Sequence, residues 1–172
     1  MLGIEGYEPH WQHSPLALAA AHRSRFRGLV GSPLTDAWLM WDVAGDAWFA
    51  HGPVILGFDE AIVEVAHRKF DECAITWGQV DMSRPPDWPG VTLDWRARGH
   101  RAVRRVRGRR LRAVNIIERD MAVDWRPPVL HAVEFLFDGA RLAIYNALDE
   151  NGLSGADEVE LPPGFWRRIP VT

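Results

Sequence analysis

Two short polar clusters are the residues best suited to chemistry, because each places two adjacent acids just after a similar apolar run. The clusters are His67, Asp71 and Glu72 in the first half of the chain and Asn146, Asp149 and Glu150 in the second. Paired acids can bind a cation through hard oxygen ligands, or transfer protons if one of them is buried. Asp, Glu and Asn are also ordinary turn residues at the ends of strands, and the sequence favours this interpretation.

The second candidate is residues 96–112, which hold nine arginines and no acid. This segment carries +9, which leaves −12 for the rest of a chain whose net charge is −3. Arginine clusters attract phosphate backbones, and Arg104, Arg105 and Arg107 are the candidate binding residues. The acidic balance of the whole chain argues against nucleic acid. The favoured interpretation is a solvated connecting helix or loop whose guanidinium groups pair with carboxylates. The expected partners are Asp94, Glu118, Asp120 and Asp124.

Nine tryptophans are spread along the 172 residues and form no stripe. Most are expected to fill the core, because each indole ring buries a large area. A ligand-stacking role is the alternative, since ligand sites are usually concave and lined by aromatic side chains. The candidates for that role are Trp41, Trp48 and Trp77.

The pattern of residues 133–145 predicts a β-hairpin, because two apolar-rich runs flank Asp138-Gly139, a dipeptide suited to a two-residue turn. The predicted pairs are Phe137 with Ala140, Phe135 with Leu142 and Val133 with Ile144. These six side chains share one face of the hairpin, and the opposite face, which carries Arg141, is mixed. Phe135→Ala should therefore cost about 3–5 kcal/mol of stability, and Arg141→Ala less than about 1 kcal/mol.

Residues 54–66 predict a second hairpin of the same kind, 79 positions earlier in the chain. Its predicted pairs are Phe58 with Ala61, Leu56 with Val63 and Val54 with Val65. Further matches at similar offsets flank both hairpins, which predicts an internal duplication within a single domain. The predicted parts are an N-terminal helical segment (1–30), a first pseudo-repeat (31–96), an Arg-rich connector (97–107) and a second pseudo-repeat (108–172).

The fold class that these patterns predict is α+β, mostly antiparallel β-sheet with an N-terminal helix. Ser14 and Pro15 predict the start of that helix, which is expected to end at Arg25 or Phe26. Strands are predicted at 35–42, 47–50, 53–58, 61–67, 73–77, 91–96, 111–119, 129–137, 140–147, 157–161 and 165–169.

Composition narrows the functional classes. The single cysteine, Cys73, allows no internal disulfide and favours a reducing compartment. The first residues lack the charged and apolar regions of a signal peptide, and no apolar run approaches the length of a membrane span, so a cytoplasmic protein is expected. His10 and His13 lack a third ligand, so we expect no metal and no cofactor.

No Gly-x-Ser-x-Gly elbow, His-Glu-x-x-His, Cys-x-x-Cys or phosphate loop occurs in the sequence. We therefore expect a non-catalytic bacterial binding or interaction module, by analogy a partner-neutralising protein of the immunity type. Its partner would be another protein or a small ligand. The first alternative is a small enzyme or cation-binding protein that uses the two polar clusters. The second is nucleic-acid binding through the arginine segment.

Overall fold

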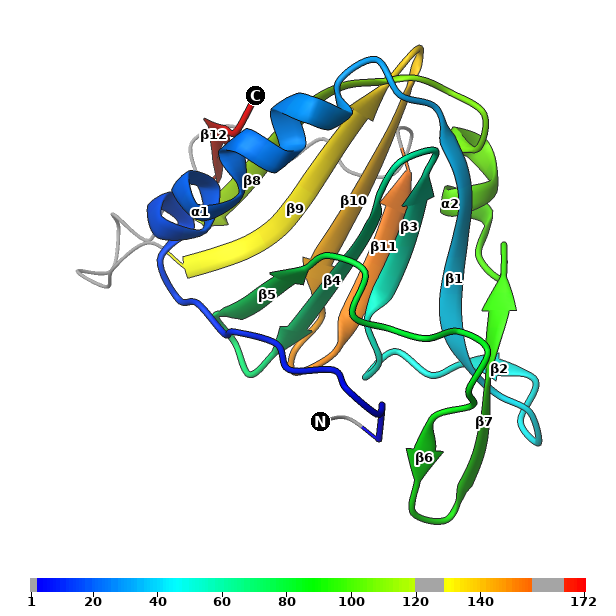
Figure 1. Ribbon diagram of the computed structural model, residues 1–172. Coiled ribbons are helices and arrows are strands. Elements are labelled where there is room, and N and C mark those ends of the chain that lie inside the picture. The colour runs from blue at the N-terminus through cyan, green and yellow to red at the C-terminus, as the bar shows by residue number, and fades with distance from the viewer. Residues whose placement is uncertain (1–2, 120–128, 156–165) are drawn as a thin grey trace.

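The structure is a computed structural model that describes residues 3–119, 129–155 and 166–172 (Figure 1). Two antiparallel sheets and two helices make up the fold. This arrangement confirms the predicted α+β class dominated by antiparallel strands. Within these three ranges, neither helix has the length and apolarity that crossing a membrane requires.

Sheet 1 contains seven strands, taken from the first part of the chain. They are β1 (Leu34–Asp42), β2 (Ala47–Trp48), β3 (Val54–Phe58), β4 (Ile62–Arg68), β5 (Glu72–Thr76), β6 (Asp87–Trp88) and β7 (Val91–Ala97). Their order across the sheet is β5-β4-β3-β1-β7-β6, and β2 pairs with β1.

Sheet 2 contains five strands, in the order β11-β10-β9-β8-β12. They are β8 (Leu111–Arg119), β9 (Val129–Phe137), β10 (Ala140–Asn146), β11 (Asn151–Gly155) and β12 (Trp166–Pro170). The two sheets meet where β4 packs against β10 and β11.

The predicted registers of both hairpins are confirmed. In β9–β10, Phe135 lies opposite Leu142, and the other two predicted pairs also match. In β3–β4, Val54 lies opposite Val65 and Leu56 opposite Val63. Phe58 and Ala61 exchange backbone hydrogen bonds of 2.8 and 3.4 Å across the Asp59-Glu60 turn. Alternation of apolar side chains thus fixed both registers, because a slip of one residue would turn the apolar face to solvent.

Helix α1 (Pro15–Leu29) begins as predicted, because the Ser14 hydroxyl accepts a hydrogen bond from the Ala17 amide at 3.2 Å. Its predicted end was too early. The helix continues through Gly28 and is followed by Gly31, whose φ of 93° is a left-handed conformation that glycine adopts without strain. α1 packs on β8 and β12 of sheet 2.

A second helix, α2 (Arg101–Val106), occupies the arginine segment, for which a solvated connecting helix or loop was predicted, and its arginines are exposed. Its Ala102, Val103 and Val106 are buried, and the helix packs against β10 and β11. The three apolar residues recur at a spacing of one and three positions, so they form one helical face among the arginines. The buried face of α2 could have been predicted from that spacing, but the many arginines around it obscured the pattern.

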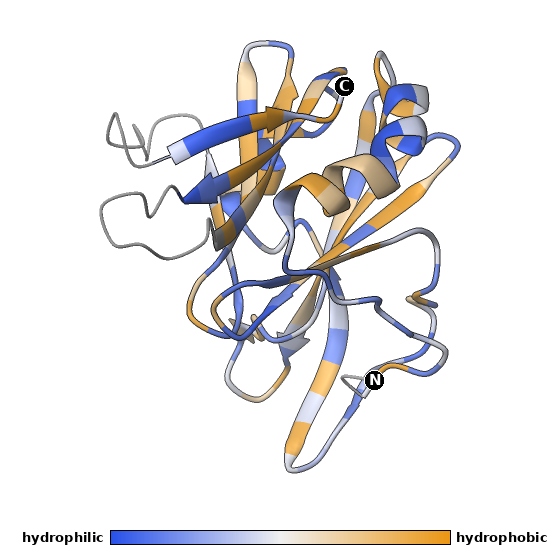
Figure 2. Cartoon of the chain, turned by 90° about the vertical axis from the view of Figure 1, so that its left-hand side faces the viewer, coloured by the Kyte–Doolittle hydropathy of each residue, from blue (hydrophilic) through white to orange (hydrophobic). Residues whose placement is uncertain are grey.

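One buried cluster joins the inner faces of both sheets to α1 and α2. In Figure 2 the strands carry much of the hydrophobic sequence. A second cluster lies on the other face of sheet 1, where Ile4 and Tyr7 of the N-terminal segment pack against Met40, Ile55 and Leu93. The N-terminal segment, which the sequence left without a role, therefore shields this face from water.

The predicted strand at 157–161 lies outside the described residues. Instead, β11 forms at residues 151–155, which the sequence did not predict because Asn-Gly-Leu-Ser-Gly has low strand propensity. Packing explains why one position of this strand must be glycine. A Cβ atom at Gly152 would lie 2.2 Å from Cζ of Tyr145 on the neighbouring strand, so only glycine fits there.

Candidate functional site

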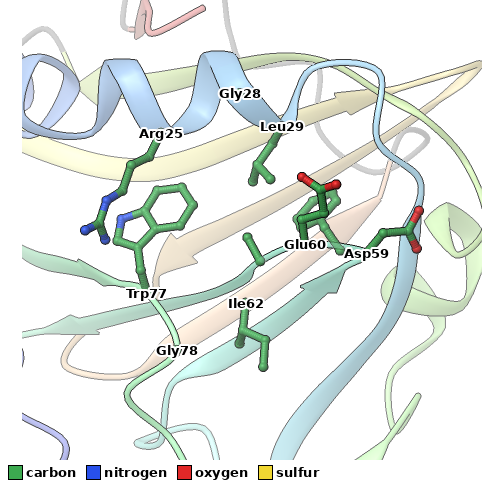
Figure 3. Close-up of a pocket in the computed structure, with 10 residues that line it drawn as sticks. Arg25, Gly28, Leu29, Asp59, Glu60, Ile62, Trp77 and Gly78 are labelled. Carbon is green, nitrogen blue, oxygen red and sulfur yellow. The ribbon is translucent and has the colours of Figure 1, made fainter.

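A pocket of about 720 Å³ lies between the C-terminal end of α1 and the β3–β4 hairpin (Figure 3). Its lining consists of helix residues, the hairpin and the start of the segment after β5. These residues are Arg25, Gly28, Leu29, Phe58, Asp59, Glu60, Ala61, Ile62, Trp77 and Gly78. The volume falls within the range of small-ligand sites in proteins.

The two sides of the pocket come from elements that belong to different layers of the fold. α1 rests on sheet 2, whereas the hairpin that faces its C-terminal end belongs to sheet 1. Leu29 and Phe58 are buried and contribute to the apolar lining. Gly28 leaves open space on the helix side of the pocket. A Cβ atom built there meets nothing within 4 Å.

Trp77 forms one wall and is held by its neighbours. Its Nε1 donates to Nδ1 of His22 at 3.1 Å, and its ring centroid lies 5.0 Å from that of Phe26. Burial and the nearby Arg25 lower the pKa of His22 to about 4. The imidazole is therefore neutral near pH 7, and Nδ1 can accept the hydrogen bond that the indole N–H donates. The indole is preorganised before any ligand arrives.

Charges of opposite sign stand on opposite sides of the pocket. Figure 3 shows Arg25 beside Trp77 on one side, and Asp59 and Glu60 on the other. The Arg25 guanidinium lies 5.4 Å from the Trp77 ring centroid, in cation–π range. All three charged residues are exposed, and none forms an ion pair with another of the described residues.

The predicted catalytic residues gather elsewhere, where the β4–β5 turn meets the β10–β11 turn. Asp149 accepts a hydrogen bond from the Lys69 backbone amide, and its own amide donates to the Lys69 carbonyl at 3.2 Å. Asn146 lies at the start of the second turn, where its side chain accepts from the Leu148 and Asp149 amides at 3.1 and 3.3 Å. The two clusters are thus neighbours in space, whereas the enzyme interpretation requires them to converge on one cleft.

His67 is buried at this junction. Its Nδ1 lies 3.0 Å from Oδ1 of Asn151 on β11, and the His67 backbone amide donates to the same oxygen. Burial lowers the pKa of His67 to about 4 despite that bond. A neutral ring with 2% of its surface exposed is placed to join the sheets and has no open route to a substrate.

The acids at the junction are engaged in local pairs. Asp71 lies 3.1 Å from His13 Nδ1, and Glu150 lies 4.0 Å from His51 Nε2. Burial of Glu72 opposes its ionisation, but bonds from Lys69 and Arg68 outweigh that effect and lower its pKa. None of these acids, nor His67 or Asn146, lines the pocket beside α1. Over the described residues, no group of three or more His, Cys, Asp and Glu side chains is placed to hold a metal ion.

The arginine segment bonds to the fold at many points, and several of its guanidinium groups pair with carboxylates as predicted. Arg104 and Arg107 donate to the carbonyl oxygens of Arg98 and Thr35, both at 3.0 Å. Arg105 accepts at its own carbonyl from Arg109 Nε at 2.8 Å. The ion pairs that join the segment to described acids include Arg96 with Asp46, Arg98 with Asp36 and Arg112 with Asp138.

Of the four acids expected as partners, the two that the structure describes have other partners. Glu118 pairs with Arg167 of β12, and Asp94 accepts the Trp95 amide at 2.7 Å. Asp120 and Asp124 lie outside the described residues. For Asp94 and Glu118, proximity in sequence was misleading, because the strands bring more distant acids next to the arginines.

Of the three candidate tryptophans, only Trp77 lines the pocket. Trp41 is covered by the guanidinium of Arg96, 4.1 Å from its ring centroid. Trp48 packs against the core, and its ring centroid lies 5.8 Å from that of His100.

The other pocket residues carried no signal in the sequence. Arg25 read as part of a basic helix end, and Asp59-Glu60 as a turn. Their convergence depends on how α1 crosses sheet 2, which no local pattern encodes. Comparison with known proteins adds no guidance, since no family model, curated protein or solved structure matches the chain.

Proposed function

We propose that the protein is a non-catalytic binding module whose ligand site is the pocket between α1 and the β3–β4 hairpin. The observation that carries the proposal is a held tryptophan in an apolar pocket with unmatched charges on two sides. Binding sites commonly combine an apolar lining with a few polar groups that orient the ligand.

Binding is favoured over catalysis by the chemistry of the lining. It offers one guanidinium, two carboxylates, one indole, one phenyl ring and aliphatic side chains. No serine, cysteine, lysine or histidine is among these ten residues, so the usual nucleophiles other than carboxylate are absent from the described lining. The neutral His22 is occupied by the Trp77 indole.

Gly28→Leu offers a direct test, because it fills the pocket from the helix side. The substitution adds a side chain where the backbone has room, and leucine is the better helix former. Ala20→Leu is the matched control, since Ala20 is exposed on α1 and does not line the pocket.

The readout is a titration of isotope-labelled protein with phenethylamine and 3-phenylpropionate, followed by backbone amide NMR. We expect shifts at residues 25–29, 58–62 and 77–78 in the parent and in Ala20→Leu, and their loss in Gly28→Leu. Shifts that are absent from these residues, or that survive in Gly28→Leu, would contradict the proposal.

We further propose that the two halves derive from a duplicated unit and that the protein works in the cytoplasm. The duplication is supported by strand order. Taken along the chain without β2 and β6, the five strands of each sheet follow the sequence fourth, third, second, first, fifth. A reducing compartment is supported by Cys73, a buried free thiol whose pKa is raised by burial.

Nucleic-acid binding is not proposed. Arginines that donate to backbone carbonyls and pair with Asp36, Asp46 and Asp138 are less available to phosphates. The immunity-type role stays a prediction by analogy.

A further inference from the structure

We propose that the ligand of this pocket is a short zwitterionic peptide with an apolar side chain. Its carboxylate would pair with Arg25, and its amino group would pair with Asp59 and Glu60. This inference rests on the proposed binding function and adds the chemical class of the ligand.

The anionic end of the ligand is assigned from Arg25. Its guanidinium lies along the Trp77 ring and forms no ion pair with the described residues. Guanidinium presents a planar fork of N–H donors that matches a carboxylate in a bidentate geometry. The indole beside it limits the directions that the side chain can take, which lowers the entropy lost on pairing.

The cationic end is assigned from the hairpin turn. Asp59 and Glu60 are its two central residues, and reciprocal backbone bonds between Phe58 and Ala61 hold the turn. Both carboxylates are exposed and without ion-pair partners among the described residues. A primary ammonium group, with three donors, can bond to a carboxylate of this turn.

The middle of the ligand is assigned from the surface between these charges. Leu29, Phe58, Ala61 and Ile62 line it, and Trp77 stands at its side. An apolar side chain that covers this surface gains from burial, at about 25 cal/mol for each Å² removed from water. A bare metal ion would leave this surface unused.

The balance of charge excludes ligands of one sign. A phosphate-rich ligand would meet two carboxylates for a single arginine, and a polycation would leave Arg25 beside like charge. A molecule with one positive end, one negative end and an apolar centre satisfies all three walls. A pocket of about 720 Å³ also has room for more than a single amino acid.

The experiment measures the affinity of the tripeptide Ala-Phe-Ala by NMR titration, in four forms. The forms have free termini, an acetylated amino end, an amidated carboxyl end, or both ends blocked. We expect each block to weaken binding by about two- to fivefold in the parent protein, as for loss of a partly exposed ion pair.

Variants then assign each end to its wall. Acetylation should have no further effect in the double variant Asp59→Asn with Glu60→Gln, and amidation none in Arg25→Gln. The matched controls are Arg23→Gln and Glu8→Gln, which change exposed charges outside the pocket and should keep the parent's response to both blocks. Thermal unfolding of every variant checks that the fold is retained.

Two failures are distinguishable. If the doubly blocked peptide binds as tightly as the free peptide, or if Arg25→Gln abolishes the effect of acetylation, the zwitterion assignment is overturned and pocket binding stands. If neither Ala-Phe-Ala nor the two phenyl compounds shifts the lining residues in the parent, both the assignment and the proposed function are wrong.

Discussion

His67 on β4 and Asn151 on β11 form a hydrogen bond of 3.0 Å that joins the two sheets where β4 packs against β11. The Asn151 amide is fixed from its other side, because its Nδ2 donates to the carbonyls of Ala50 and Gly52 at 3.2 and 2.7 Å. Its oxygen must therefore be the acceptor, so His67 carries its proton on Nδ1. A residue considered for catalysis is thus part of the joint between the sheets.

Asn151→Ala should destabilise the protein by about 3 kcal/mol or more. The substitution removes four hydrogen bonds and leaves the His67 amide, His67 Nδ1 and the Gly52 carbonyl without this partner in a buried place, whereas the Ala50 carbonyl keeps its bond from the backbone amide of residue 151. Urea unfolding measures the loss. The control is Ser24→Ala, an exposed position on α1 that should change stability by less than about 0.5 kcal/mol. Similar values for the two variants would show that the joint contributes little.

Stability should fall as the pH drops from about 6.5 towards 4. The pKa of His67, His22 and His131 is lowered to about 4 in the folded protein, with burial as the main cause in each. Between these values the unfolded chain binds protons that the folded chain does not, so protonation favours unfolding. The stabilisation is present above pH 6.5 and is lost as the pH falls through the folded pKa.

His67→Gln tests the largest share of this dependence, because His67 is the most buried of the three. The shift corresponds to roughly 3 kcal/mol at most between pH 6.5 and 4. The variant should be less stable at pH 7.5, since it alters the joint, but its unfolding free energy should vary less between pH 7 and 5 than that of the parent. Parallel pH profiles, measured by urea unfolding, would assign the acid sensitivity to other groups.

Local sequence patterns predicted the hairpins because their information lies within a few residues. The Asp138-Gly139 turn and the alternation around Phe135 specify a register without help from the rest of the chain. The Ser14 cap likewise specifies where α1 begins. The pocket could not be predicted in this way. Arg25 and Glu60 line the same pocket only because α1 packs on sheet 2, and this packing depends on contacts distant in sequence.

The hairpin face that carries Arg141 also departs from its prediction, and the energetic expectation changes with it. Arg141 pairs with Glu134 at 2.6 Å, and Glu134 is fully buried. The sequence could not show this, because Arg168 and Asn115, the other partners of Glu134, come from β12 and β8. The face that looks mixed in the hairpin sequence is a buried ionic network in the folded protein.

Arg141→Ala should therefore cost about 2 kcal/mol, more than the value below 1 kcal/mol that the face pattern predicted. The reason is that removal of one partner leaves a buried carboxylate less compensated. Phe135→Ala should still cost about 3–5 kcal/mol, because the ring is fully buried in the main core. Urea unfolding of both variants decides the matter. A cost below about 1 kcal/mol for Arg141→Ala would restore the original assignment.

A substitution at Leu148 is expected to raise stability. The backbone there is strained, and the exposed side chain gains little from packing. Its φ is 65° and its surface is 75% exposed, whereas bulky residues rarely adopt a left-handed conformation. The backbone amides of Leu148 and Asp149 donate hydrogen bonds to the Asn146 side chain, so a new side chain at position 148 preserves these bonds.

Leu148→Asn should raise stability by about 0.5–1 kcal/mol, since asparagine tolerates the left-handed region better than leucine. Leu16→Asn is the matched control, an exposed leucine in the first turn of α1 with ordinary helical backbone, where no gain is expected. Thermal unfolding of the two variants measures the difference. A loss of stability in Leu148→Asn would mean that the exposed leucine side chain makes contacts that outweigh the backbone strain.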